Sequence, residues 1–421
     1  MNKEKNIYFP NLDDVKAAAE TIKKVSAVTP LSSSLRYSKQ YEANILLKRE
    51  DLQQVRSYKI RGAFNKISSL TNEEASNGVV CASAGNHAQG VALSCKLLKI
   101  KGTIFMPAPT PNQKVEQVKM FGEDYIDIKL VGDTFDDAYH AAMLECDELR
   151  KTFIHPFNDP KVIEGQATIA LEILEQTTDP IDYVFIAVGG GGLAAGLSTV
   201  FKELSPKTKI IGVEPEGAPS MTVSIKNNKN TELDHIEKFI DGAAVKRVGD
   251  LTFDICKINL HAMITVPEGK VCQTILELYN KDAIVVEPAG ALSISALDFY
   301  AEDIKGKNVV CVVSGSNNDI TRTSEIKERA LLYANLKHYF IVKFPQRAGA
   351  LKEFVVDILG PNDDITYFQY AKKTNRENGS AVVGVQLKSA TDLNPLIDRM
   401  KHHNFYGDYL NDKPDLFQFL V

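Results

Sequence analysis

The sequence predicts an α/β protein that ends in a small α+β unit, and two patterns support this prediction. Up to about residue 325, short apolar runs rich in valine and isoleucine alternate with helical patterns. These runs lack polar alternation, which is typical of strands buried on both faces of a parallel sheet covered by helices. Beyond about residue 336, apolar and polar positions alternate, as on a sheet with one covered face.

The apolar runs of the first part mark its strands and helices in chain order. The expected elements are the strand 79–82 with helix 88–98, the strand 101–106 with helix 113–121, the strand 183–188 with helix 193–204, and the strands 209–214 and 309–313. Ligands of such sheets bind beyond the carboxyl ends of the strands. We therefore expect the chemistry of this protein in the loops that follow these strands.

The tail predicts a ferredoxin-like unit. Phe340, Val342 and Phe344 alternate with polar positions, as on a half-covered strand. The elements expected after this strand are an amphipathic helix over 351–359, strands near 365–371 and 381–387, a helix over 393–400 and a strand over 405–410. This gives the order β-α-β-β-α-β. The tail has no candidate nucleophile or metal cluster, so we expect it to bind a ligand or to serve assembly.

Composition narrows the class of protein further. The hydrophobic fraction of 44% and the charged fraction of 24% are typical of a globular protein. A net charge of −5 argues against nucleic acid or an anionic membrane as the main partner. No apolar run approaches the ~20 residues that span a bilayer, and no signal-peptide pattern is present. The six cysteines are scattered without metal-ligand spacing. Cys81 and Cys311 lie in strand-like runs, which predicts buried thiols in a reducing compartment, so we expect a cytosolic protein.

The first group that can carry chemistry is the segment from Ser57 to Ala63. Its Lys59 lies between Tyr58 and Ile60. A lysine in this setting is more often an ordinary helix residue whose charged end reaches solvent. In a tight and partly apolar setting, however, an amine loses pKa and can form an imine with an aldehyde. The segment alone leaves both interpretations open.

The second group is the segment from Ser83 to Gly90, directly after the strand 79–82. A strand, a turn of small residues and a helix start together present backbone N–H groups to an anion. Asn86 offers a ligand both a donor and an acceptor. An ordinary Gly-Asn turn that caps a helix explains the same residues about equally well. We interpret His87 as a structural histidine at the helix start.

The third group is Gly189 to Gly192, followed by Leu193, between an apolar strand and an apolar helix. Four consecutive glycines cost conformational entropy unless the backbone must approach something closely, and an anion at the helix N-terminus suits that position. No Lys-Ser/Thr pair follows, so the loop is not that of a nucleoside-triphosphate site. A dinucleotide fingerprint is the competing interpretation, because Ala194 fits its last position and Glu214 follows about 20 residues later.

The fourth group is Ser314 to Asn317 at the end of the strand 309–313. A hydroxyl there can bond a heterocyclic nitrogen without protonating it. An ordinary Ser-Gly turn is the alternative interpretation, and it is favoured when this group is taken alone.

Taken together, these motifs resemble those of the threonine dehydratases, which have the two-lobed, mostly parallel fold of tryptophan-synthase-like pyridoxal-phosphate enzymes (fold type II). The resemblance covers nearly the whole chain, in family order: residues 57–63, 83–90, 189–193, 212–215, 287–291 and 314–315. It displaces the dinucleotide interpretation, which gives no role to Lys59, Asn86 or Ser314. The tail resembles the ACT-like regulatory domain of the biosynthetic enzymes. The implied domains are a catalytic part over 1–325, a linker over 326–337 and a regulatory part over 338–421.

The resemblance implies pyridoxal 5'-phosphate as cofactor and a role for each motif. Lys59 matches the lysine that holds the cofactor as a Schiff base and removes the α-proton. Asn86 matches the contact to the ring hydroxyl, and Ser314 matches the partner of the pyridine nitrogen. The matching phosphate loop is Gly189, Gly190, Gly191, Gly192 and Leu193, and the matching loop for the substrate carboxylate is Ser83, Ala84, Gly85, Asn86 and His87. Glu287 lies in a matching motif without an assigned role.

The implied reaction converts L-threonine to 2-oxobutanoate and ammonia, the first step of isoleucine synthesis, with L-serine as a secondary substrate. Ala84 stands where related racemases carry a serine base, so we expect dehydration rather than racemisation. Ser220 stands where those racemases carry an aspartate, which argues against a divalent metal site. The tail has room for one ACT-like unit. The resemblance therefore implies a homotetramer with inhibition by isoleucine and activation by valine, although a single unit leaves the response itself open.

Three other functions stay open at this point. The enzyme could use serine as its main substrate, which only kinetics with both amino acids decide. The chain could be an oxidoreductase that binds a dinucleotide at Gly189 to Ala194 with Glu214. It could also be a non-catalytic amino-acid sensor that uses the tail, although the intact Lys59 counts against this.

Overall fold

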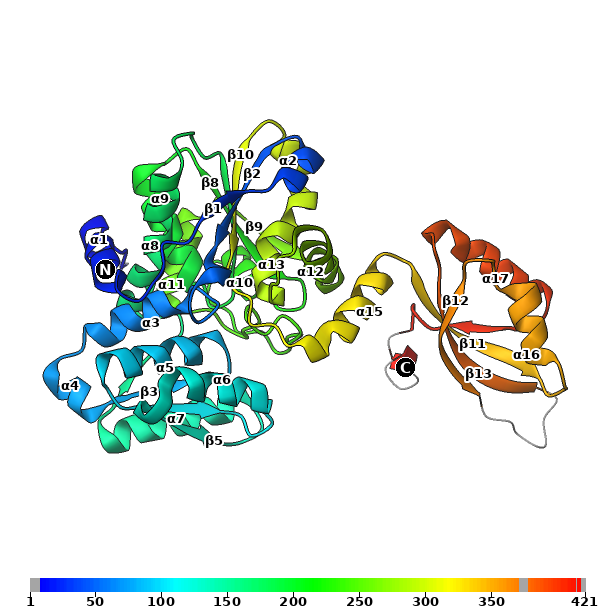
Figure 1. The fold of residues 1–421 in the computed structure, drawn as a ribbon, viewed down its shortest axis with the longest axis horizontal. Coiled ribbons are helices and arrows are strands. Elements are labelled where there is room, and N and C mark those ends of the chain that lie inside the picture. Colours follow the sequence, from blue (N-terminus) through cyan, green and yellow to red (C-terminus); the bar gives the residue numbers. More distant parts are fainter. Residues whose placement is uncertain (1–7, 371–377, 414, 418–421) are drawn as a thin grey trace. The chain divides into compact units, whose positions relative to one another are not determined.

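The computed structural model describes residues 8–370, 378–413 and 415–417. The chain forms two compact units, residues 1–320 and residues 321–421, which Figure 1 shows as ribbons. Among the described residues, no helix has the length and apolar character needed to cross a membrane.

The first unit contains two sheets, one in each of its two lobes. The six-stranded sheet has the order β1-β2-β10-β7-β8-β9, and the four-stranded sheet has the order β5-β4-β3-β6. The larger sheet consists of β1 (Leu31–Ser33), β2 (Asn44–Arg49), β10 (Asn308–Val313), β7 (Tyr183–Ala187), β8 (Lys209–Pro215) and β9 (Ala262–Val266). The smaller sheet consists of β5 (Ile126–Leu130), β4 (Gly102–Met106), β3 (Val79–Ala82) and β6 (Thr152–Phe153). Every pairing is parallel except that of β1 with β2, so the predicted α/β class is confirmed.

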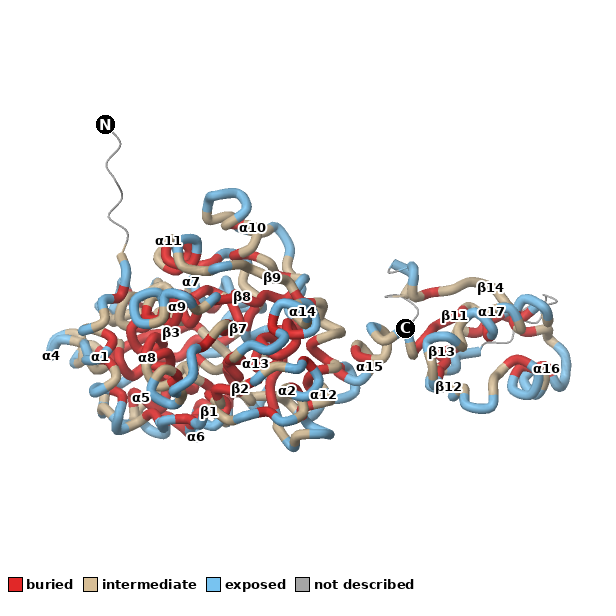
Figure 2. The backbone as a smooth tube through the Cα atoms, turned by 90° about the horizontal axis from the view of Figure 1, so that it is seen from above, coloured by how far each residue is buried: buried red, intermediate tan, exposed pale blue. Residues whose placement is uncertain are grey.

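The strands that the apolar runs predicted lie at the centre of the two sheets. All residues of β3, β4 and β7 are buried, as are five of the six in β10. In Figure 2 the buried parts of the tube gather in the interior of the unit. Strands covered on both faces need no polar side, which is why their sequences show no alternation.

Helices cover both sheets. They are α1 (Leu12–Ile22), α2 (Leu35–Tyr41), α3 (Lys59–Ser68), α4 (Asn72–Asn77), α5 (Asn86–Leu98), α6 (Asn112–Gly122), α7 (Phe135–Leu149), α8 (Pro160–Gln176), α9 (Gly192–Leu204), α10 (Ser220–Lys226), α11 (Asp250–Asn259), α12 (Glu268–Asp282), α13 (Pro288–Ser295) and α14 (Ala301–Ile304). Short 3-10 helices are η1 (Glu50–Leu52), η2 (Glu123–Tyr125) and η3 (Ala296–Tyr300), with η4 (Ile320–Arg322) at the boundary of the units.

Helices α3, α5 and α8 approach one another closely near Lys59. A Cβ at Gly165 of α8 would lie 2.6 Å from the backbone oxygen of Arg61 in α3. A Cβ at Gly90 of α5 would lie 3.1 Å from the backbone oxygen of Lys59. Backbone atoms cannot move aside as a side chain can. Glycine at these two positions therefore allows α5 and α8 to lie this close to α3.

The second unit begins with α15 (Thr323–Tyr333) and contains a sheet of the order β12-β13-β11-β14 with only antiparallel pairs. Its elements are β11 (Lys337–Pro345), α16 (Ala350–Glu353), the π-helical η5 (Phe354–Ile358), β12 (Asp364–Tyr370), β13 (Asn378–Gln386), η6 (Ala390–Asp392), α17 (Leu393–His402) and β14 (Tyr406–Tyr409). The predicted order β-α-β-β-α-β is present. The predicted strand end at residue 371 lies outside the described residues.

One face of this sheet carries the core of the second unit. Phe340, Val342 and Phe344 of β11 are all buried, in agreement with their predicted alternation. They pack in one cluster with Phe354 of η5 and Met400 of α17. The two helical segments therefore cover the same face of the sheet.

Candidate active site

Lys59 is the first residue of α3, and the end of β10 holds the chain just before it. The backbone N–H of Tyr58 donates to the carbonyl of Ser314 over 3.2 Å, and Ser57 forms an isolated bridge with Gly315. The Lys59 Nζ donates to the carbonyl oxygen of Pro156 over 2.9 Å. Two motifs about 255 positions apart in the sequence thus meet at one place.

The surroundings of Lys59 favour its neutral form. Burial lowers the pKa of the Lys59 amine to about 8, and the nearby carboxylate of Glu287 partly opposes this shift. Burial also raises the pKa of Glu287 to about 7, and Asp241 adds to the rise. A lysine with a pKa near 8 is about one tenth neutral at pH 7, far more than an ordinary lysine. Only this neutral amine can attack a carbonyl or take a proton.

Gly189, Gly190 and Gly191 lie between β7 and α9, and Gly192 is the first residue of α9. Packing within the protein requires glycine in this loop. Gly191 has φ +92°, a left-handed conformation that favours glycine. A Cβ at Gly190 would lie 2.1 Å from the ring of Phe157, and one at Gly189 would lie 3.0 Å from the Cα of Ala243.

The backbone N–H groups of this loop are free to receive an anion. Among the described residues, no protein acceptor takes the N–H of Gly189, Gly190 or Gly191. The carbonyl of Gly190, by contrast, accepts from the Thr252 hydroxyl over 2.6 Å, which holds the loop in place. N–H groups that end at the start of a 13-residue helix form a site for phosphate.

The segment from Ser83 to His87 joins β3 to α5. The Gly85 N–H donates to the Ser83 hydroxyl over 3.3 Å, and Asn86 is the first residue of the helix. Asn86 Nδ2 donates to Glu287 Oε1 over 2.6 Å. Ala84 is half-buried in this turn.

His87 and Ser314 are buried on neighbouring segments. His87 contacts the carbonyl of Ile154 through Nε2 at 2.8 Å, and burial lowers its pKa to about 3, so its ring is neutral. The Ser314 hydroxyl donates to the carbonyl of Ala289 over 3.2 Å. Because a hydroxyl has one hydrogen, Ser314 can turn that hydrogen to a ligand nitrogen only by releasing Ala289.

Glu214 does not provide a ribose-binding carboxylate. It is buried, and its oxygens accept from the N–H groups of Met221 (2.7 Å) and Thr222 (2.9 Å) and from the Thr222 hydroxyl (2.7 Å). The carboxylate therefore caps α10. Ser220 donates its hydroxyl to the carbonyl of Val245. These contacts remove the basis of the dinucleotide interpretation.

Three functional neighbours were not found from the sequence. Pro156, Phe157 and Asn317 contact Lys59, the glycine loop and Asn86 respectively. The sequence does point to Asn317, because this residue belongs to the motif that begins at Ser314. It does not point to the carbonyl of Pro156 or the ring of Phe157, because their roles depend on packing between distant segments.

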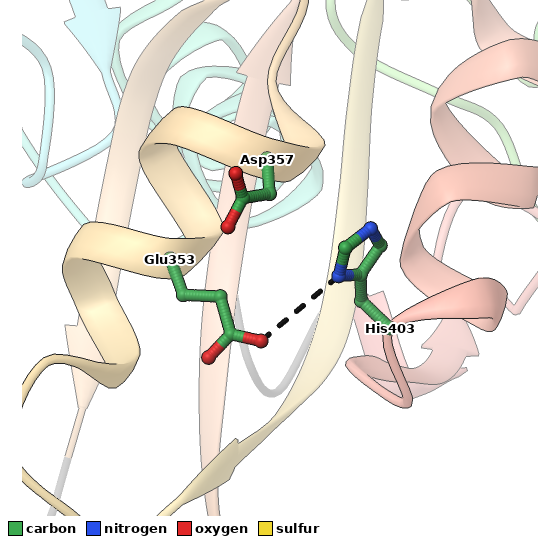
Figure 3. A group of neighbouring side chains, drawn as sticks. All are labelled: Glu353, Asp357 and His403. Atoms are coloured by element: carbon green, nitrogen blue, oxygen red, sulfur yellow. Dashed lines mark ion pairs between the residues drawn. The ribbon is translucent and has the colours of Figure 1, made fainter.

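Side chains that could ligate a metal ion gather at one place among the described residues, in the second unit. Figure 3 shows this group, Glu353, Asp357 and His403, whose ligand atoms lie within 4.8 Å of one another. The His403 Nδ1 is 3.9 Å from Glu353 Oε1, and Glu353 also pairs with Arg347. With Asp357 exposed, the contacts are those of a surface ion pair.

Comparison with known proteins identifies the family. Residues 22–315 match the family of pyridoxal-phosphate dependent enzymes, and residues 328–420 match the C-terminal regulatory domain of threonine dehydratase. The chain belongs to the threonine dehydratase family. It is a pyridoxal-phosphate-dependent lyase with a regulatory domain.

Relatives in this family cover nearly the whole chain. The L-threonine dehydratase biosynthetic IlvA of Halalkalibacterium halodurans is 54% identical over 97% of this chain and 99% of its own length. The protein of the same name from Bacillus subtilis is 56% identical over 96% of both chains. Among solved structures, the processed form of threonine deaminase isoform 2 from Solanum lycopersicum has a TM-score of 0.73 at 39% identity and covers 78% of this chain and 91% of that chain.

Pyridoxal phosphate fits the residues present. The free N–H groups at the start of α9 suit its phosphate, and the Lys59 amine suits its aldehyde. Ser314 presents a donor that cannot protonate a pyridine nitrogen. The phosphate, the aldehyde and the pyridine nitrogen of the cofactor thus each have a group of suitable chemistry among these residues, and the individual roles stay predictions.

The pKa of Lys59 predicts how fast cofactor-free enzyme takes up pyridoxal phosphate at different pH. Only the neutral amine reacts, so the rate should rise about tenfold per pH unit below pH 8 and level off above it. Stopped-flow absorbance of the new imine band measures this rate. The same reaction with a free lysine analogue shows which part of the pH dependence comes from the titration of the cofactor itself. The analogue should level off only near the ordinary lysine pKa of about 10.4.

Glu287→Gln provides the directional check on this pH dependence. The carboxylate raises the pKa of Lys59, so its removal should lower that pKa and move the profile to lower pH. A profile of the unchanged enzyme that keeps rising to pH 10 would show that Lys59 is not desolvated as described.

Proposed function

We propose that this enzyme converts L-threonine into 2-oxobutanoate and ammonia as the first step of isoleucine synthesis, and that L-serine is a secondary substrate. One observation carries the proposal. Lys59, whose amine has a pKa of about 8, is the first residue of α3, and the Ser314 segment holds the chain just before it. Relatives named biosynthetic threonine dehydratase align with this chain over nearly its full length, which supports the substrate.

The mechanism assigns a task to each motif. Pyridoxal phosphate, when bound, withdraws electron density from the substrate's α-carbon. The neutral Lys59 amine takes the α-proton and can return a proton to the leaving β-hydroxyl, which departs as water. The N–H groups of residues 189–193 would bind its phosphate, Asn86 would bond its ring hydroxyl and Ser314 would donate to its pyridine nitrogen. The unsaturated amine that is released hydrolyses to 2-oxobutanoate and ammonia.

The segment from Ser83 to His87 binds the substrate carboxylate through its backbone N–H groups at the start of α5. Within that segment, the methyl group of Ala84 can neither accept nor donate a proton. Lys59 is therefore the base on one face of the α-carbon, and Ala84 provides none on the other. We accordingly expect elimination without appreciable racemisation.

The remaining assignments concern regulation and assembly. We infer that residues 1–325 form the catalytic domain, 326–337 the linker and 338–421 the regulatory domain. Isoleucine binds the regulatory domain and inhibits turnover, and valine opposes this inhibition. The enzyme acts in the cytoplasm as a homotetramer.

Removal of residues 338–421 tests whether turnover and the response to isoleucine belong to different domains. The division into units at residue 320 supports the expectation that the shortened enzyme keeps threonine turnover. It should no longer respond to isoleucine at concentrations that inhibit the full chain. A coupled assay for 2-oxobutanoate measures both, with serine run in parallel to rank the substrates. Inhibition of the shortened enzyme at an unchanged isoleucine concentration would contradict the regulatory assignment.

A further inference from the structure

Asn317 lies in the loop after β10 and contacts two other segments of the first unit, the Val55 loop and the start of α5, through one amide group. Its Nδ2 is 2.9 Å from the carbonyl oxygen of Val55, 2.6 Å from Asn86 Oδ1 and 3.0 Å from Gln89 Oε1. Its Oδ1 is buried and has no hydrogen-bond partner in the structure. The amide thus acts here only as a donor.

The carbonyl of Val55 fixes the direction of this chain of amides. A backbone carbonyl only accepts, so Asn317 must turn its NH₂ group toward Val55. Asn86 must then turn its own oxygen toward Asn317, which places its NH₂ group against the carboxylate of Glu287 at 2.6 Å. If the Asn86 amide were reversed, its NH₂ group would face the NH₂ group of Asn317 and its oxygen would face the Glu287 carboxylate. Both contacts would then be repulsive.

Glu287 is the second contact that holds Asn86. It is buried as the N-cap residue of α13, and Gly315 leaves the space for it, since a Cβ there would lie 2.5 Å from Glu287 Oε1. The Asn86 NH₂ group has two hydrogens, and Glu287 takes one. Asn86 has no other partner among the described residues, so one N–H remains for a ligand.

We propose that Asn317 is a positioning residue that, together with Glu287, fixes the amide of Asn86 so that its remaining N–H is presented to the ring hydroxyl of pyridoxal phosphate. The proposal rests on the role proposed above for Asn86. It gives Asn317 no contact with substrate or cofactor. The side chain of Asn317 acts through Asn86, whereas its backbone N–H, which bonds Glu287, is the same in every variant at this position.

Asn317→Asp is the decisive variant because it keeps the shape of the side chain and removes its hydrogen-bond donors. The new carboxylate would repel the Val55 carbonyl and draw the Asn86 NH₂ group toward itself. Equilibrium dialysis of cofactor-free enzyme should give a pyridoxal-phosphate dissociation constant raised roughly tenfold or more. Asn317→Ala introduces no acceptor and should give a smaller rise, and it replaces the aspartate variant if that one does not fold.

Ser316→Ala is the matched control in the same loop. Its hydroxyl donates to the carbonyl of Asp51 over 3.2 Å and does not contact Asn86. Cofactor affinity should be unchanged in this variant. Thermal unfolding of the cofactor-free proteins checks that each variant is folded at the temperature of the dialysis. Asn317→Asp, which loses its bond to the Val55 carbonyl, should have the lower midpoint of the two.

A double-mutant cycle separates positioning from a merely structural role. In an Asn86→Ala background, Asn317→Asp should have no further effect on cofactor affinity. An equal loss in both backgrounds, or wild-type affinity of the single Asn317→Asp variant, would overturn the proposal. If Asn86→Ala alone left the affinity unchanged, the proposed role of Asn86 would fail as well, which distinguishes the two failures.

Discussion

Lys59→Ala is expected to lower 2-oxobutanoate formation from threonine by about 10⁴-fold or more. The substitution removes both the amine that bonds the cofactor and the base that takes the α-proton. Pyridoxal phosphate should still occupy the site, held by the loop before α9, but without a covalent bond to the chain. Borohydride reduction followed by peptide mass spectrometry should place the cofactor on Lys59 in the unchanged enzyme and find none in the variant.

Lys66→Ala is the matched control for this experiment. Lys66 has the same type of side chain on the same helix and pairs with Asp159 at 3.0 Å. This variant should remain yellow and active. If Lys59→Ala kept more than about a hundredth of the turnover, another residue would have to be the base.

Arg61→Ala is expected to lower the free energy of unfolding by about 3–5 kcal/mol. The guanidinium is buried and contacts Glu50 at 2.8 Å and Glu172 at 2.6 Å. Lys48, which is also buried, pairs with the same Glu172 at 2.5 Å. Without Arg61, Glu50 stays buried with no cation bonded to it, and that uncompensated charge is the source of the loss.

Urea unfolding of the cofactor-free enzyme measures this loss. The control is Lys23→Ala, whose pair with Glu20 at 3.4 Å is exposed on both sides and contributes about 0.5 kcal/mol or less. Arg61→Lys keeps the charge but not the paired N–H geometry, and should fall between the two. Equal unfolding midpoints for Arg61→Ala and Lys23→Ala would mean that the buried network does not stabilise α3.

The central strands were predictable from the sequence because burial on both faces leaves a continuous apolar run. The sequence did not predict strand β2, because Lys48 and Arg49 leave it without a continuous apolar run. Lys48 is fully buried there only because Glu172 of α8 neutralises it from a distant part of the chain. Long-range charge pairing of this kind leaves no local signal. Helices α7 and α8 were also not predicted.

The site was predictable where a motif carries its own geometry. The glycine loop and the start of α5 follow their strands directly, so their position at the sheet edge could be predicted from order alone. What surrounds them could not, because it comes from other segments. Phe157 is the example: its ring fills the space beside Gly190, yet nothing in the sequence near residue 157 indicates a site.

The position of β10 has a consequence for how this enzyme matures as it is synthesised. It pairs with β2 on one side and β7 on the other, and its first residue bonds Asn44, 264 positions earlier in the chain. A ribosome makes the chain from the N-terminus, so β2 and Lys59 emerge long before the strand that completes the sheet. Ser314 and Asn317 arrive last of the motifs. All four motifs are therefore present together only once the chain has been made past residue 317, and until then β2 and β7 each have an unpaired edge.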